Sequence, residues 1–225
     1  MSYTIDLEKI SLKKYGEILQ SQDLLPSRRI LLDELEAKLC RIADAGVNNL
    51  LELKQNLSSP SKLSSFSVRT NIPEDYLVIL KRELGSLEQK PVPIASFPGI
   101  SELIVIKLKE QNIHTSRDLY HLIITKKDQE AVEIKGVHKN ELDEIYCLCK
   151  LVRINGVGAV AARALYESGY RDIPDIAHTD TQLLLTKISE ANSIGHYYNA
   201  KLGLKDMKFI IDYANLLLDA EKLTR

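Results

Sequence analysis

The sequence predicts an all-α fold. Apolar residues recur at helical spacing in several segments, for example from Leu31 to Leu39 and from Leu142 to Leu148. No convincing run of alternating apolar and polar residues is long enough to predict a strand. A third observation is a turn pattern that returns along the chain, each time between two helical segments. Together, these features predict tandem helical units without a sheet.

The repeated turn begins with Gly or Asn, and the copies occupy residues 46–53, 112–119 and 169–176. Gly or Asn at the first position suits the left-handed conformation in which many helices end. The residues that follow can cap the next helix. The candidate N-caps are Asn48 or Asn49, Thr115 or Ser116, and Asp172. The first positions are 66 and 57 residues apart, a period that indicates tandem supersecondary units.

The clearest boundary in the chain is at residues 85–93, where one glycine and two prolines forbid a continuous helix. We therefore predict an N-terminal helical segment at 1–22, followed by repeats at 23–88, 93–150 and 151–225. The first repeat diverges most from the common pattern. We expect the second and third repeats to pack as one unit.

The most informative turn contains the glycine pair Gly156 and Gly158. Apolar Ile154 and Val157 flank it, and an alanine-rich helical segment starts directly after it. Glycine allows a partner to approach the backbone closely. The first amides of a helix are unpaired and carry the positive end of the helix dipole. Such a turn can hold a phosphate group through backbone amides alone.

Residues 154–165 resemble the helix-hairpin-helix motif, in which apolar–Gly–apolar–Gly precedes a helix that begins with small residues. The resemblance implies contact with the sugar-phosphate backbone of DNA without sequence readout. The candidate hairpin at 97–101 has serine in place of the second glycine, and the one at 24–29 has almost lost the pattern. The predicted fold is therefore all-α with three tandem helix-hairpin-helix-like repeats, in the SAM-like class of architectures.

The candidate phosphate-binding residues are of two kinds. Backbone amides would come from Gly156, Gly158, Ala159 and Val160, and positive charge from Lys150, Arg153, Arg163 and Arg171. A second interpretation stays open, in which the glycines only let two helices cross closely and the alanines pack between them. Motif matches of this length are hypotheses, so we carry both interpretations forward.

Charge and composition limit the function classes. The chain has 225 residues, of which 44% are hydrophobic and 27% charged, and its formal net charge is −1. A dedicated nucleic-acid-binding protein more often has a basic excess, so we expect micromolar affinity or weaker. The lack of Trp and the presence of only three Phe disfavour stacking platforms for single strands. No phosphate-loop, nucleophile-elbow or zinc-protease motif is present, and we expect no enzyme activity and no cofactor.

The three cysteines, Cys40, Cys147 and Cys149, lie in apolar helical patterns and are predicted to be buried, reduced thiols of an intracellular protein. Neither the cysteines nor the five scattered histidines have zinc-ligand spacing, so we predict no metal site. The sequence contains no apolar run of membrane-spanning length and no signal-peptide pattern at its start. We therefore expect a cytoplasmic protein without membrane contact.

Arg28 and Arg29 follow Pro26 at a predicted helix start with Ser27 as N-cap. Because cations at a helix N-terminus oppose the helix dipole, we expect an anionic partner, and favour a carboxylate of the same chain over an external anion. The lysine pairs Lys13–Lys14 and Lys126–Lys127 are interpreted as solvated helix faces.

Several motifs together resemble the DUF4332 family, a family of unknown function. They are Asp23–Ile30, Pro73–Leu77, Lys90–Val92, Phe97–Ile100 and Arg153–Gly158. The resemblance extends from about Asp23 onward. It implies helix-hairpin-helix-like repeats and a nucleic-acid role, and it names no reaction.

Two hypotheses follow from the sequence. The first is a non-catalytic module that binds DNA or another nucleic acid weakly and without sequence preference. The alternative is a protein-interaction or scaffold module, in which the hairpins serve only packing and the stacked helices present a partner surface. An enzyme is a distant third, because no residue pattern calls for an active site.

Overall fold

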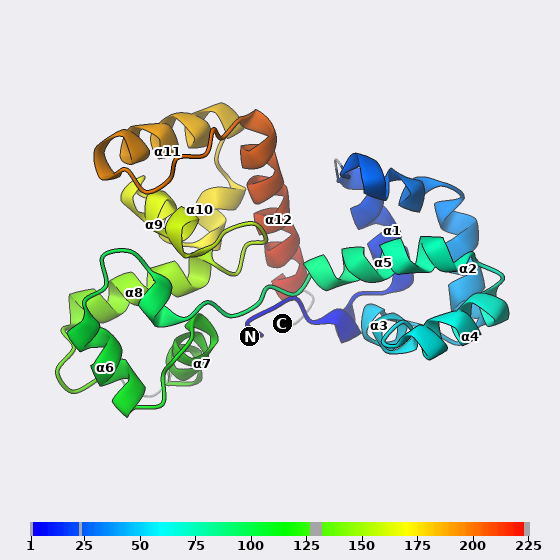
Figure 1. The fold of residues 1–225 in the computed structure, drawn as a ribbon, viewed down its shortest axis with the longest axis horizontal. Coiled ribbons are helices and arrows are strands. Elements are labelled where there is room, and N and C mark those ends of the chain that lie inside the picture. The colour runs from blue at the N-terminus through cyan, green and yellow to red at the C-terminus, as the bar shows by residue number, and fades with distance from the viewer. Residues whose placement is uncertain (1, 23, 127–131, 223–225) are drawn as a thin grey trace. The chain divides into compact units, whose positions relative to one another are not determined.

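The computed structural model describes residues 2–22, 24–126 and 132–222, and within them the chain forms helices and no strand (Figure 1). The prediction of an all-α fold is confirmed. The chain divides into two compact units, which we describe separately. The N-terminal unit comprises 5–88 and 219–222, and the C-terminal unit comprises 2–4 and 89–218.

The N-terminal unit is built from short helices with turns between them. In chain order these are η1 (Leu7–Lys9), α1 (Leu12–Ser21), η2 (Pro26–Leu32), α2 (Leu35–Asp44), α3 (Leu50–Asn56), α4 (Pro60–Thr70) and α5 (Glu74–Ser86). Helix α4 packs on α5 and α2, α1 packs on α2, and α5 packs on η2. Their buried faces form the core of the unit, with Leu19, Ile42 and Leu77 fully enclosed.

The segment around Arg28 differs from the prediction at its start. Residues 26–32 form a 3-10 helix with Leu25 at the N-cap position, so the predicted N-cap role of Ser27 is wrong. Pro26 takes the first helical position, for which its fixed φ is suited, and Ser27 therefore falls inside the helix. The predicted intrachain partner is confirmed, because the Arg28 guanidinium pairs with the buried carboxylate of Glu83.

The C-terminal unit is also built from helices joined by turns. In chain order they are η3 (Ile94–Ser96), α6 (Glu102–Glu110), α7 (Ser116–Lys126), α8 (Lys139–Leu151), α9 (Ala159–Glu167), α10 (Ile173–Ala177), α11 (Thr181–Gly195) and α12 (Leu204–Lys222), the last of which belongs to this unit as far as residue 218. Helix α8 packs on α7 and α9, and α9 packs on α11 (Figure 1). Helix α9 thus lies against neighbours on both sides.

The repeated turns have the predicted backbone conformation. Gly46, Asn112 and Gly169 have positive φ angles of 82°, 58° and 94°. These values lie in the left-handed region that Gly, and to a lesser extent Asn, adopts readily. The conformation required at the first position therefore explains why the pattern begins with these two residue types.

The helix N-caps that follow these turns also have the same hydrogen-bond pattern. The N-caps among the predicted pairs are Asn49, Thr115 and Asp172, whose side chains accept hydrogen bonds from amides of the next helix. In each turn, the backbone amide two residues after the first position donates a hydrogen bond to a carboxylate in the next helix. The acceptors are Glu52 for the Asn48 amide, Asp118 for the His114 amide, and Asp175 for the Arg171 amide. Burial raises the pKa of Asp118, but the bonds from His114 and Thr115 outweigh it and the pKa is lowered overall.

The cysteines only partly follow the prediction. Cys149 is buried and Cys147 is half-buried, whereas Cys40 is exposed on α2. Burial raises the pKa of both Cys147 and Cys149, which keeps them protonated at neutral pH. The prediction for Cys40 is wrong because it lies on the outward face of its amphipathic helix. Lys127 of the predicted solvated pair and Asp23 of the first family motif lie outside the described residues.

Candidate functional site

Three turns in the described part of the C-terminal unit share one geometry. In each, the amide of the fourth residue donates to the carbonyl of the first, with N–O distances of 3.4 Å at 97–100, 3.0 Å at 134–137 and 3.0 Å at 154–157. The third residue is Gly99, Gly136 or Gly156, with φ of 83°, 84° and 83°. This is the pattern of a type II turn, which requires positive φ at that position.

The turn at 134–137 was not predicted to be a relative of the other two. The signal was present, because Ile134-Lys-Gly-Val137 repeats the apolar–x–Gly–apolar spacing of Ile154-Asn-Gly-Val157. The second glycine of the motif is replaced by His138, so the segment lacks the full helix-hairpin-helix pattern. The turn itself depends only on the first glycine.

The helices that follow these turns are capped differently. At α6 the Ser101 hydroxyl accepts from the Ile104 amide, and at α8 the Glu141 carboxylate accepts from the His138 amide. At α9 the N-cap is Gly158, no side chain caps the helix, and its first turn holds no acidic residue. The first amides of α9 therefore remain open to an external acceptor.

The turn before α9 faces solvent. Gly156, Gly158 and Val160 are exposed, and Ala159 is half-buried. Gly158 has an ordinary extended conformation, with φ of −86° and ψ of −176°, and a Cβ added there would have no atom within 4 Å. Neither the backbone nor the packing therefore requires glycine at 158. What the missing side chain provides is access to the amides behind it.

Gly156 has a different role from Gly158. Its φ of 83° strains any residue with a Cβ, and that Cβ would lie 3.2 Å from Cε1 of Phe209 on α12. Gln89 also supports the turn, because its Nε2 donates to the Ile154 carbonyl at 3.1 Å and to Oδ1 of Asn155 at 3.3 Å. Gly156 thus provides the positive φ that the turn requires, and Gly158 leaves the first amides of α9 accessible to solvent.

We expect Gly156→Ala to destabilise the C-terminal unit by about 1–2 kcal/mol, the usual cost of positive φ in a residue with a Cβ. Gly158→Ala is the matched control and is expected to cost about 0.5 kcal/mol, because its φ is ordinary and its surroundings are open, and only the poorer N-cap propensity of Ala remains. Urea unfolding of both variants measures the difference. Equal stability of the two variants would contradict the assignment of separate roles.

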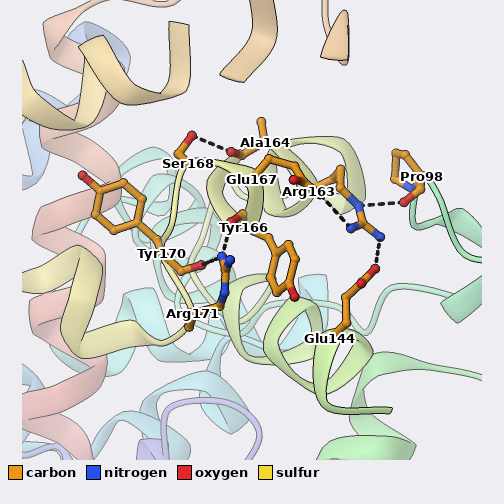
Figure 2. A network of polar contacts seen from close by, with 9 residues as sticks. All are labelled: Pro98, Glu144, Arg163, Ala164, Tyr166, Glu167, Ser168, Tyr170 and Arg171. Carbon is orange, nitrogen blue, oxygen red and sulfur yellow. Dashed lines mark hydrogen bonds and ion pairs between the residues drawn. The ribbon is translucent and has the colours of Figure 1, made fainter. Parts of the chain in front are cut away.

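Arg163 lies inside the fold and is 5% exposed (Figure 2). Its Nε donates to the Pro98 carbonyl at 2.7 Å, Nη2 pairs with Glu144 at 2.7 Å, and Nη1 pairs with Glu167 at 3.1 Å. The guanidinium also covers Gly99, where an added Cβ would lie 3.3 Å from Nη2. Arg163, which belongs to α9, therefore links the turn at 97–100 to α8 and α9 through these bonds.

Arg153 is likewise enclosed, with 4% of its surface exposed. Its Nε donates to the Tyr3 carbonyl at 2.8 Å, and its guanidinium lies 4.4 Å from the centre of the Tyr120 ring. The Tyr3 hydroxyl is 2.6 Å from Oγ of Ser116, and burial raises the pKa of Tyr3 to about 12. Because Arg153 and Arg163 are both buried in contacts within the unit, we leave them out of the interface considered below.

Lys150 and Arg171 are more accessible but also have partners. Nζ of Lys150 lies 2.7 Å from Oδ2 of Asp172. The Arg171 guanidinium stacks on the Tyr166 ring at 3.7 Å and bonds to the Tyr166 carbonyl, as Figure 2 shows. Arg171 is exposed and Lys150 half-buried. Their predicted contact with a phosphate stays a prediction.

A lysine that sequence analysis did not select lies on the same helix as Phe209. Lys205 is exposed and precedes Phe209 by four residues on α12, so the two side chains share a helix face. Because a Cβ at Gly156 would lie 3.2 Å from the Phe209 ring, that face borders the turn. The signal was a basic residue one helical turn before an exposed aromatic, which no motif search would have singled out.

The packing interpretation also has support within the same helix. Ala162 and Ala164 are buried, and α9 packs on α8 and α11. These alanines therefore allow close helix packing. The start of α9 faces solvent while residues 162–165 are buried, so the two interpretations apply to different parts of one helix.

Within the described ranges, no group of three His, Cys, Asp or Glu side chains lies close enough to hold a metal ion. No helix in that part of the chain is long and apolar enough to cross a membrane.

The protein is therefore a helical protein in which glycine turns lead into the N-termini of helices. At one of these N-termini, that of α9, no side chain caps the first amides. Residues 98–217, which are 120 of the 225, match the family described as a domain of unknown function (DUF4332), and the chain belongs to that family. The turn at 154–157 lies inside the match, and the motifs at 23–30, 73–77 and 90–92 lie outside it. No curated protein and no solved structure matches the chain.

Proposed function

We propose that this protein is a non-catalytic nucleic-acid-binding protein that holds the sugar-phosphate backbone without reading sequence. The observation that carries the proposal is the uncapped, exposed N-terminus of α9 behind Gly158, with no acidic residue in its first turn. A phosphate oxygen accepts hydrogen bonds from such amides and is stabilised by the helix dipole. The predicted cytoplasmic location is part of this proposal.

The proposed contacts are mainly backbone contacts. Amides of Gly158, Ala159 and Val160 face the phosphate, and Lys205 on the bordering face of α12 adds one positive charge. Lys150 and Arg171 contribute only if they leave their present partners. With few cations involved, the binding is weak, and its salt dependence is shallow because the salt slope scales with the number of phosphates that Lys or Arg neutralises.

We further propose that the glycine turns at 97–100, 134–137 and 154–157 are related helix-hairpin-helix-like hairpins. Their shared hydrogen bond and positive φ support this relation. Capping by Ser101 and by Glu141 closes the first two to an anion, which leaves them as packing hairpins. The N-terminal unit has η2 at residues 26–32, where the hairpin of the first repeat was predicted, so the first repeat departs most from the common pattern.

Fluorescence-anisotropy titration of labelled duplex and single-stranded DNA tests the proposal. At low salt we expect binding that does not depend on sequence. For this surface the slope of log affinity against log salt is expected to be roughly −1, as for one phosphate neutralised by Lys205. Two unrelated sequences of equal length serve as the specificity control. No binding at low salt, where electrostatic contacts are strongest, would refute the proposal.

A protein-interaction module remains the second candidate because of one specific feature. Leu103 and Ile106, one helical turn apart on α6, are 62% and 51% exposed. Exposed apolar pairs of this kind favour a protein partner over a nucleic acid. A partner retained after nuclease treatment and lost in the double variant Leu103→Ser, Ile106→Ser would support this candidate.

A further inference from the structure

A polar depression lies on the N-terminal unit, in a part of the chain outside the family match. Its lining comes from the end of α3 and the exposed face of α4, and includes Asn56, Ser61, Lys62, Ser65 and Arg69. Lys62, Ser65 and Arg69 are exposed and follow each other at spacings of three and four residues. They therefore form one stripe along α4, which we call the α4 stripe.

Neighbouring side chains orient Arg69, the last residue of the α4 stripe. Nη2 of Arg69 donates to Oδ1 of Asn56 at 2.7 Å, and the guanidinium lies 5.0 Å from the centre of the Phe66 ring. Phe66 is buried and holds the stacked guanidinium in place. Arg69 is thus held in one orientation while its side chain remains on the surface, which lowers the entropic cost of binding an anion.

The charge of the stripe is not neutralised locally. The sequence from 53 to 73 contains Lys54, Lys62 and Arg69 and no Asp or Glu. Within the described residues, neither Lys62 nor Arg69 pairs with a carboxylate, whereas Lys54 pairs with Glu88. The depression is lined by no acidic side chain. Two uncompensated cations therefore face solvent across a lining of hydroxyl and amide groups.

A second depression lies on the other side of Arg69, and its lining shows where the cationic surface ends. It is lined by Arg41 and Asp44 as well as Arg69, and Arg41 lies 3.7 Å from the carboxylate of Glu34. Asp44 and the carboxylate of Glu34 place negative charge on that side. The cationic surface is therefore restricted to the Lys62 side, and it has the form of a line along α4.

We propose that the α4 stripe is a second contact surface for the phosphate backbone of nucleic acid. Seven residues of α-helix separate Lys62 from Arg69, a rise of about 10 Å. A line of two cations without acidic neighbours is complementary in charge to the row of phosphates along one strand, and the serine and amide side chains of the same depression can bond to sugar and phosphate oxygens.

This proposal shares its ligand class with the function proposed above but uses other residues in the other unit. Either can therefore fail without the other. Because both surfaces belong to one chain, simultaneous engagement would raise the apparent affinity above that of either contact alone.

The test compares the full-length double variant Lys62→Gln, Arg69→Gln with the wild type in a titration of labelled duplex DNA at several salt concentrations. Lys9→Gln, Lys13→Gln is the matched control, because both lysines are exposed in the same unit and the charge change is equal. We expect the α4 variant to bind roughly tenfold more weakly at low salt and to lower the salt slope by about 2, while the control keeps the wild-type slope. Arg69→Lys is expected to retain part of the slope.

Equal behaviour of the α4 variant and the control would overturn the proposal. The same titration with Gly158→Asp separates the two surfaces: loss of binding only in Gly158→Asp leaves the function above and refutes the stripe, and loss only in the α4 variant does the reverse. A phosphoserine peptide is the competing probe. Binding of that peptide but not of DNA, abolished in the α4 variant, would assign the stripe to phosphoprotein instead.

Discussion

Gly158→Asp is expected to weaken nucleic-acid binding at least tenfold while it stabilises the fold. An aspartate at this N-cap position accepts hydrogen bonds from the first amides of α9, which no side chain caps at present. Its charge also repels a phosphate at the same place. Charge-assisted hydrogen bonds contribute about 1.5–3 kcal/mol each, so loss of one such bond reduces affinity about tenfold or more. The cap itself adds roughly 0.5–1 kcal/mol of stability.

Opposite effects on stability and binding make this variant informative. Anisotropy titration gives the affinity, and thermal unfolding gives the stability. Gln182→Glu is the control, because it adds the same charge in the first turn of α11, where Asp180 already caps the helix. We expect the control to bind almost as the wild type does. Wild-type affinity in Gly158→Asp would remove the turn from the interface, even if the protein binds DNA elsewhere.

Local features of the fold were predictable from the sequence. Helices follow from apolar spacing, and the turns at Gly46, Asn112 and Gly169 follow from the need for positive φ. Such signals are contained in a few adjacent residues. The same holds for the caps at Asn49 and Asp172, where a short polar side chain and a carboxylate three residues later form a recognisable pair.

The state of the arginines was not predictable, because it depends on distant contacts. Arg153 bonds to Tyr3, which is 150 positions away, and Arg163 bonds to Pro98, 65 positions away. Proximity to the glycine pair in the sequence suggested a phosphate role for both. Tertiary packing instead placed them against carbonyls, carboxylates and an aromatic ring. Exposure of Gly158 was equally beyond the sequence, since a Gly-x-Gly turn is compatible with burial and with exposure.

Arg163→Met is expected to lower the free energy of unfolding of the C-terminal unit by about 2–4 kcal/mol. The change removes the bond to the Pro98 carbonyl and leaves Glu144 and Glu167 without their cation. Breaking a buried ion pair on one side costs several kcal/mol, and the partial exposure of both carboxylates reduces that cost. Because Arg163 also covers Gly99, its loss should loosen the turn at 97–100.

Arg171→Met is the matched control, because Arg171 is a nearby arginine whose guanidinium is stacked on Tyr166 at the surface. Loss of an exposed arginine costs less than about 1 kcal/mol, and urea unfolding monitored by circular dichroism resolves the two values. DNA affinity measured on folded Arg163→Met protein should equal that of the wild type. A variant of unchanged stability and weakened DNA binding would instead show that Arg163 leaves its buried contacts to bind phosphate. That result would return it to the interface predicted from the sequence.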